Sequence, residues 1–253
     1  MRTKKILLSW ILALSVLLAG CQFSSQTSDS IGRFSKANAA YKAGDYDAAL
    51  KLYGQITDDG FVSALIYYNI GNCFMKKNDL GHALAWYERA LRLTPRDGDL
   101  QANLKFAKTM MKNPEVAAPK NFEQRIFVHF SCITDDEIVI ILCLLLSVIA
   151  MLILLGLYLQ WRFKKTFFLL AILTMVFIFH VFAFFAKLGI YNEHAIILST
   201  VEIKYEPEEK ATTHFTAYEG WKVRILKENS GWVKIERPDG LSGWLPRDLL
   251  ERI

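Results

Sequence analysis

The pattern of hydrophobic and polar positions divides the chain into regions of different character. Residues 31–112 carry apolar side chains at the three- and four-residue spacing of amphipathic helices. Two runs without any charged residue follow, at 138–159 and 167–186. From residue 192 onward, short alternating segments bounded by Gly and Pro predict β-strands. The pattern therefore predicts a multidomain membrane protein with an all-α domain, a two-helix transmembrane hairpin and an all-β domain at the C-terminal end.

The first 20 residues have the pattern of a lipoprotein-type signal peptide. Basic residues precede an apolar stretch, Ile6 to Leu18, which is typical of export signals. Leu18-Ala19-Gly20-Cys21 then resembles a bacterial lipobox, which makes the thiol of Cys21 a candidate for lipidation. The alternative is an ordinary signal peptide or an uncleaved anchor in which Cys21 has no role. Residues 21–30 are polar and predict a tether.

An internal repeat occupies the helical region. Gly44–Leu50 aligns with Asn78–Leu84 at an offset of 34 residues. This period resembles tetratricopeptide repeats, and the second copy has the family's signature residues at Tyr67, Ile70, Gly71, Phe74, Ala83, Tyr87, Ala90 and Pro95. Gly71 and Ala83 are small enough for two helices to approach closely, and Pro95 ends a helix. We expect an all-α superhelix of two repeats and a solvating helix at 31–112.

The resemblance implies a peptide-binding groove. Its lining would be Phe34, Asn38, Tyr41, Leu65, Tyr68, Asn69, Asn72 and Met75. Asn38 and Asn69 match the asparagines of the family's carboxylate clamp, but Phe34 and Asp99 stand where the clamp has basic residues. An apolar groove for a partner segment is therefore favoured over a carboxylate clamp. The alternative is that these side chains only pack the superhelix.

The two uncharged runs are long enough to cross a hydrocarbon core of about 30 Å. A linker and interfacial segment at 113–137 precedes them, and Thr134 to Glu137 predicts a capping box at the start of the first helix. The loop at 160–166 is basic, which places it in the cytoplasm and both flanking domains outside. His180, inside the second run, is interpreted as a neutral imidazole bonded to Ser147, Thr174 or backbone rather than as a proton relay or haem ligand.

The region 192–253 resembles bacterial SH3-like (SH3b) domains. The resemblance rests on Tyr218 to Val223 and on Gly-Trp pairs at 231–232 and 243–244. It implies a closed all-β barrel with Trp232, Gly243 and Trp244 in its core, the two tryptophans being favoured as packing residues over ligand contacts. Peptidoglycan peptides or a sister protein are the ligands suggested by the bacterial form.

Composition and charge narrow the function classes. The 253 residues are 53% hydrophobic and 22% charged, which excludes a largely disordered chain. The net charge of +5 falls to +2 without the three basic residues of the signal segment, which does not indicate nucleic-acid binding. The five histidines are scattered, the four cysteines are widely spaced, and the chain has no Walker, zincin or nucleophile-elbow motif. A non-enzymatic protein without cofactor or metal is predicted.

The order of the regions is similar to that of the BatE-type aerotolerance operon proteins. The motifs that carry this resemblance are Tyr68 to Asn72, Ala90 to Pro95 and Asn103 to Ala107. The resemblance implies membrane partners with von Willebrand A domains, indirect contact with a MoxR-type ATPase, a place in the bacterial inner membrane and a role in resisting oxidative stress. The predicted function is a scaffold with periplasmic repeat and SH3b modules. The alternative is a peptidoglycan-binding envelope sensor.

Overall fold

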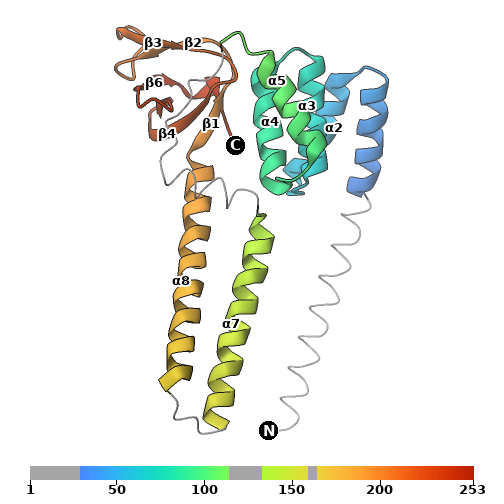
Figure 1. The fold of residues 1–253 in the computed structure, drawn as a ribbon. Helices are drawn as coiled ribbons and strands as arrows, with labels where there is room; N and C mark the ends of the chain where they lie inside the picture. Colours follow the sequence, from blue (N-terminus) through green and yellow to red (C-terminus); the bar gives the residue numbers. More distant parts are fainter. Residues whose placement is uncertain (1–28, 114–132, 159–163) are drawn as a thin grey trace, which may run out of the picture. The chain divides into compact units, whose positions relative to one another are not determined.

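A computed structural model describes residues 29–113, 133–158 and 164–253 (Figure 1). The predicted signal peptide, Cys21, most of the tether, most of the linker and most of the loop at 160–166 lie outside these residues. The chain divides into two compact units, Met1–Val62 and Ser63–Ile253, and each is treated separately below.

The first unit contains one helical repeat. Residues 29–42 are helical, and α2 covers Tyr46–Asp58. Asp45 caps α2 because its side chain accepts a hydrogen bond from the amide of Ala48 at 3.0 Å. Gly44 joins the two helices at a φ of 82°, a conformation that glycine adopts without steric cost. Ala37, Ala49, Tyr53 and Ile56 are buried between the helices.

The second unit begins with three helices, α3 (Ala64–Lys76), α4 (Leu80–Leu93) and α5 (Gly98–Thr109). A Cβ placed on Gly71 of α3 would lie 2.6 Å from the Tyr87 ring and 3.3 Å from the carbonyl oxygen of Ala83. The close approach predicted from Gly71 and Ala83 is therefore confirmed. Helix α4 ends at Leu93, two residues before Pro95, as the missing amide of proline requires.

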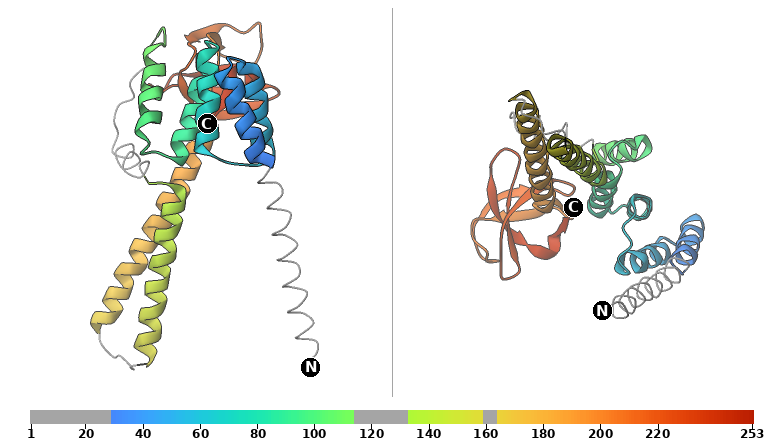
Figure 2. Two further views of the ribbon diagram at one scale, coloured as in Figure 1. Left: turned by 90° about the vertical axis from the view of Figure 1, so that its right-hand side faces the viewer. Right: turned by 90° about the horizontal axis from the view of Figure 1, so that it is seen from below.

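Two long helices follow, α7 (Asp135–Tyr158) and α8 (Lys164–Asn192), which lie side by side in Figures 1 and 2. Within the described residues one helical stretch, Asp135–Ile153, is long and apolar enough to cross a membrane. The apolar stretch in α8, Leu170–Phe185, is shorter. The first predicted span is therefore supported by its length and composition, and the predicted two-span topology stays a prediction.

The chain ends in a sheet of seven antiparallel strands. They are β1 (His194–Ile197), β2 (Val201–Lys204), β3 (Thr213–Ala217), β4 (Lys222–Asn229), β5 (Trp232–Glu236), β6 (Ser242–Pro246) and β7 (Leu250–Arg252), with a short 3₁₀ turn at Arg247–Leu249. Their spatial order is β3-β2-β6-β5-β4-β1-β7.

The predicted closed barrel is wrong, because the described strands form an open sheet. A closed barrel needs its two end strands to pair with each other. Here β3 pairs with β2, and the short β7 pairs with β1, so the two ends of the order remain unjoined. The prediction of an all-β C-terminal region is confirmed, and its closure is corrected.

One hydrophobic core runs through the second repeat and the sheet. Ala83, Leu84, Leu100 and Met111 from the helical part belong to the same buried cluster as the strand residues. On the sheet side the cluster includes Ala195, Ile196, Ile197, Val223, Val233, Ile235 and Leu245. Helix α4 contacts β1 and β7 directly. The sheet and the second repeat therefore share a core instead of forming two separate cores.

Candidate interaction surface of the second repeat

A tyrosine–asparagine hydrogen bond recurs in both repeats. The Tyr53 hydroxyl donates to Asn38 Oδ1 at 2.5 Å, and the Tyr87 hydroxyl donates to Asn72 Oδ1 at 2.6 Å. The two bonds are equivalent at the 34-residue period of the sequence. Asn38 and Asn72, both predicted to line a groove, thus have their side-chain oxygens bonded within their own repeat.

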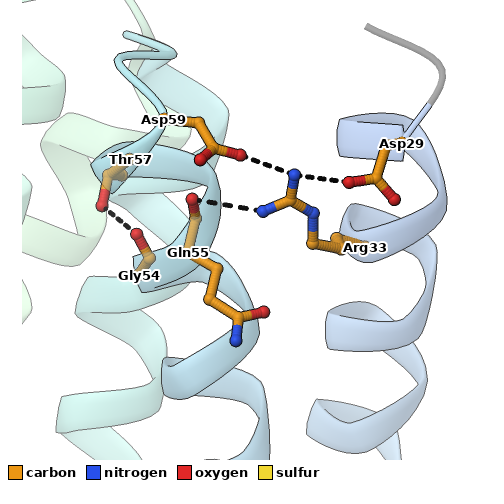
Figure 3. Close-up of polar contacts among 6 residues, drawn as sticks. All are labelled: Asp29, Arg33, Gly54, Gln55, Thr57 and Asp59. Carbon is orange, nitrogen blue, oxygen red and sulfur yellow. Dashed lines mark hydrogen bonds and ion pairs between the residues drawn. The ribbon is translucent and has the colours of Figure 1, made fainter. Parts of the chain in front are cut away.

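Arg33 lies on the first helix of the first repeat and contacts the end of α2 through polar groups (Figure 3). The second repeat uses an aromatic contact of Tyr67 with Trp86 between its two helices. The guanidinium lies 2.5 Å from Asp59 and 2.6 Å from Asp29 and donates to the Gln55 carbonyl oxygen at 3.4 Å. The hydrogen bond that the Arg33 guanidinium donates to the Asp59 carboxylate is the main cause that raises the pKa of Arg33. Charged contacts here take the place of an aromatic packing residue.

Aromatic contacts hold two predicted groove residues of the first unit, Phe34 and Tyr41, and two signature residues of the second unit, Tyr67 and Phe74. In the first unit the Phe34 ring lies 6.0 Å from Tyr53, and Tyr41 meets Tyr46 edge-on at 5.5 Å. In the second, Tyr67 lies 5.3 Å from Trp86. Phe74 stacks on His82 at 4.8 Å, and Ala83 and Ala90 are fully buried. These residues pack each repeat internally.

The second repeat presents a partly apolar surface between α3 and α5, which we call the α3/α5 groove. Its floor is Tyr68, whose hydroxyl accepts a hydrogen bond from Asn103 Nδ2 at 2.5 Å and whose ring lies 5.9 Å from Tyr87. Leu65 on α3 is 55% exposed, and Phe106 on α5 is 60% exposed. Asn69 and Met75 are half-buried on α3. Exposed large apolar side chains are a feature of many protein-binding surfaces.

The sheet contacts the start of α4 at very short range. The Glu219 carboxylate accepts a hydrogen bond from the Gly81 amide at 3.0 Å, in the first turn of the helix. A Cβ on Gly81 would lie 2.7 Å from the Cα and carbonyl oxygen of Leu198. Gly220, at a φ of 85°, leaves equally little room against Leu84. Glycine is thus required at 81 by packing, and the sheet is fixed on the helix.

A buried carboxylate joins α4, α5 and β4. Glu88 Oε1 lies 2.9 Å from the Lys108 ammonium, and its Oε2 lies 3.1 Å from the Lys222 ammonium. Burial by itself raises the pKa of the Glu88 carboxyl, but the two positive charges outweigh it and lower the pKa to about 2. Glu88 is therefore ionised in the folded protein, and both lysines are held by it.

The two predicted core tryptophans lie elsewhere. Val233, Ile235 and Leu245 fill the buried face of β5 and β6, whereas Trp232 and Trp244 are half-buried on the opposite face. The alternation of side chains along a strand requires this separation. Gly243 is buried on the same face as Leu245, and a Cβ there would clash with the Ile203 side chain and lie 2.9 Å from the Lys204 carbonyl oxygen. The core positions expected for the tryptophans are thus taken by aliphatic residues.

The start of α7 has the predicted capping box. The Thr134 hydroxyl accepts from the Glu137 amide at 3.2 Å, and the Glu137 carboxylate accepts from the Thr134 amide at 2.9 Å. The buried ammonium of Lys187 on α8 lies 2.8 Å from Asp135 and donates to the Ile133 carbonyl oxygen at 2.6 Å. His180 Nδ1 lies 2.9 Å from the Val176 carbonyl oxygen, so the side chain has a backbone partner within its own helix.

A tetratricopeptide-repeat family model matches residues 34–98. The match covers the predicted repeats and supports the assignment of this region. Comparison with curated proteins gave no match.

Sequence reasoning missed several residues of the second unit. Phe106 and Met110 were assigned to a merely solvating helix, although a phenylalanine and a methionine at the four-residue spacing, off the buried face, were a detectable signal. Glu88 and Glu219 gave no signal, because their partners Lys222 and Gly81 are far away in the sequence. Only the tertiary structure brings them together.

Proposed function

We propose that the protein is a non-enzymatic scaffold that binds a segment of a partner protein in the α3/α5 groove. The observation that supports this most is the pair of exposed apolar side chains, Leu65 and Phe106, flanking the Tyr68–Asn103 floor of a repeat that the tetratricopeptide family model matches. Repeats of this family present concave surfaces to protein segments.

The proposed place of the scaffold is the bacterial inner membrane. Asp135–Ile153 has a mean hydropathy of 2.7, and its side chains Leu144 and Met151 are each 61% exposed. A helix that is apolar on all sides requires an apolar environment such as lipid. A hairpin of α7 and α8 with both flanking domains in the periplasm remains the proposed topology, together with lipidation of Cys21.

The proposed partners follow from the resemblance to BatE-type proteins. They are membrane proteins with von Willebrand A domains and, indirectly, a MoxR-type ATPase, in a system that resists oxidative stress. The order of repeats, apolar helices and C-terminal sheet supports this proposal, and the α3/α5 groove is the face that we propose for such a partner.

The test is crosslinking of the full chain in native membranes, followed by mass spectrometry. The groove variant combines Leu65→Glu with Phe106→Glu, because both residues are more than half exposed. Lys51→Glu with Lys210→Glu is the matched control, since it alters two exposed surface residues outside the groove. Capture of von Willebrand A proteins that the groove variant loses and the control keeps is the expected result. Capture unchanged by the groove variant would contradict a role for this groove.

A second candidate function is a peptidoglycan-binding envelope sensor. The observation that favours it is the outer face of the sheet, where Trp232 and Trp244 are half-buried beside Lys234. Exposed indole faces are common platforms for sugar and peptide ligands. Binding of the full chain to purified sacculi, lost on Trp232→Ala with Trp244→Ala and kept in the groove variant, would establish this function. An isolated fragment of 192–253 would be a poor probe, because its core is shared with α4.

A further inference from the structure

We infer that the sheet closes one end of the α3/α5 groove and builds with it a composite cleft for an acidic, amphipathic segment of a partner protein. The inference rests on the proposed function, since it specifies where the partner segment ends and which chemistry it carries. It concerns residues of the second unit only.

The end of the groove is located by two pairs of residues. Tyr68 and Asn103 are hydrogen-bonded, which brings the early parts of α3 and α5 together. Met75 and Met110 lie two helical turns further along their respective helices and line one common cleft. The two helices therefore run in the same direction, and the groove leads from the exposed Leu65 to the two methionines.

The sheet forms the far wall of this cleft. Thr200, Tyr218 and Glu219 line it opposite the methionines. These residues are fixed there by the contacts of the sheet with α4, in particular the hydrogen bond of Glu219 to Gly81 and the burial of Glu88 between Lys108 and Lys222. The cleft thus exists only because the sheet and the second repeat share a core.

The size of the cleft indicates what it accepts. Its volume is about 180 Å³, below the roughly 300–1,000 Å³ of typical small-molecule sites. It suits one large apolar side chain of a bound segment. The flexible thioethers of Met75 and Met110 adapt to side chains of different shape, as methionines do at many protein-binding surfaces.

The charges around the cleft favour a partner segment with negative charge. Lys112 lines the cleft, and Lys76 follows Met75, the cleft residue on α3; both lysines are exposed. Within the described residues no acidic side chain forms an ion pair with either lysine. Glu219 is the one acid that lines the cleft, and its Oε1 accepts the Gly81 amide. A segment with Asp or Glu beside its apolar anchor would be attracted to this rim.

The experiment selects random short peptides, displayed on phage, against the full chain in detergent. Peptides that pair Asp or Glu with Leu, Phe or Met are expected to be enriched. A synthetic peptide of the enriched sequence should bind the full chain, and Lys112→Glu should weaken it about tenfold, as should Thr200→Trp, which fills the cleft from the sheet side. Lys210→Glu, at an exposed site outside the cleft, should leave the affinity unchanged.

Each of three outcomes would overturn the inference. Enriched peptides without acidic residues would show that the rim does not select charge. Some peptides could need Leu65 and Phe106 for binding and yet bind the Thr200→Trp and Lys112→Glu variants with unchanged affinity. This result would exclude the composite cleft but would not contradict the proposed function. If no enriched peptide loses affinity for the Leu65→Glu and Phe106→Glu variant, the proposed function fails and the inference fails with it.

Discussion

The carboxylate of Glu88 on α4 lies 3.1 Å from the ammonium of Lys222 on β4, although 134 residues separate the two in the chain. The same carboxylate lies 2.9 Å from Lys108 on α5. The negative charge of Glu88 thus compensates two positive charges at the place where α4, α5 and the sheet meet. Because Glu88 is nearly enclosed, the strength of this contact depends on the carboxylate staying ionised.

Removal of the charge at Glu88 should loosen the sheet from the repeat. Glu88→Gln keeps the shape of the side chain but leaves two lysines without their counter-charge, and we expect unfolding to become easier by about 1–3 kcal/mol. This cost is at the low end of that for an unpaired buried charge, because both lysines are partly exposed and can be solvated in the variant. Denaturant titration followed by tryptophan fluorescence would measure the change. Glu202→Gln removes a carboxylate from an exposed pair with Lys204 and should change stability much less than Glu88→Gln does.

The same carboxylate predicts a dependence of stability on pH. The folded pKa of Glu88, about 2, lies below its ordinary value of 4.5. A depressed pKa adds stability above the unfolded value, and this stability is lost as the pH falls through the folded value. The stability difference between the wild type and Glu88→Gln should therefore be constant above about pH 5 and shrink toward pH 2. A difference that stayed constant across that range would contradict the low pKa.

Two glycines at helix starts should respond in opposite directions to alanine. Gly81→Ala puts a Cβ 2.7 Å from the Leu198 backbone, which cannot move aside as a side chain would. We expect a loss of about 1–3 kcal/mol. At Gly98, the first residue of α5, no atom lies within 4 Å of the new Cβ. Gly98→Ala should be neutral or stabilise by up to about 1 kcal/mol. Thermal unfolding of both variants would show whether the sheet really packs this closely.

Much of the fold could be predicted from the sequence because local patterns encode it. The 34-residue repeat, Gly71, the capping box at Thr134 and strand Trp232–Glu236 all depend on residues close together in the chain. The shared core could not be predicted, because it depends on Gly81, Leu84 and Glu88 meeting a sheet more than 100 residues later. The placement of Trp232 and Trp244 was missed because strand alternation fixes which residues share a face but not which face is buried.

The thiol of Cys73 should be unreactive in the folded protein. Burial raises the pKa of Cys73 to about 11, so about one thiol in a thousand is ionised at pH 8. Alkylation by iodoacetamide at that pH should be slow at Cys73 and become fast only after denaturant unfolds the repeat. Peptide mass spectrometry would report the modified site. Rapid labelling of Cys73 in the native protein would contradict its burial on α3.

Lys187 and Asp135 form an ion pair that joins the start of α7 to the end of α8. The ammonium of Lys187 is buried, lies 2.8 Å from Asp135 and donates to the Ile133 carbonyl oxygen. Among the residues that the structure describes, Lys187→Met would leave Asp135 with only the more distant Arg92 as a cationic partner, at 3.9 Å. Asp135→Asn would in turn leave a buried ammonium without its counter-charge. Either single change should therefore be clearly destabilising, whereas the double variant should recover part of the loss.

A double-mutant cycle of thermal stability in detergent should give a coupling of about 0.5–3 kcal/mol. The matched cycle at the exposed pair Arg224 and Glu236 should give a smaller value. Equal coupling in both cycles would show that burial adds nothing to the contact between α7 and α8.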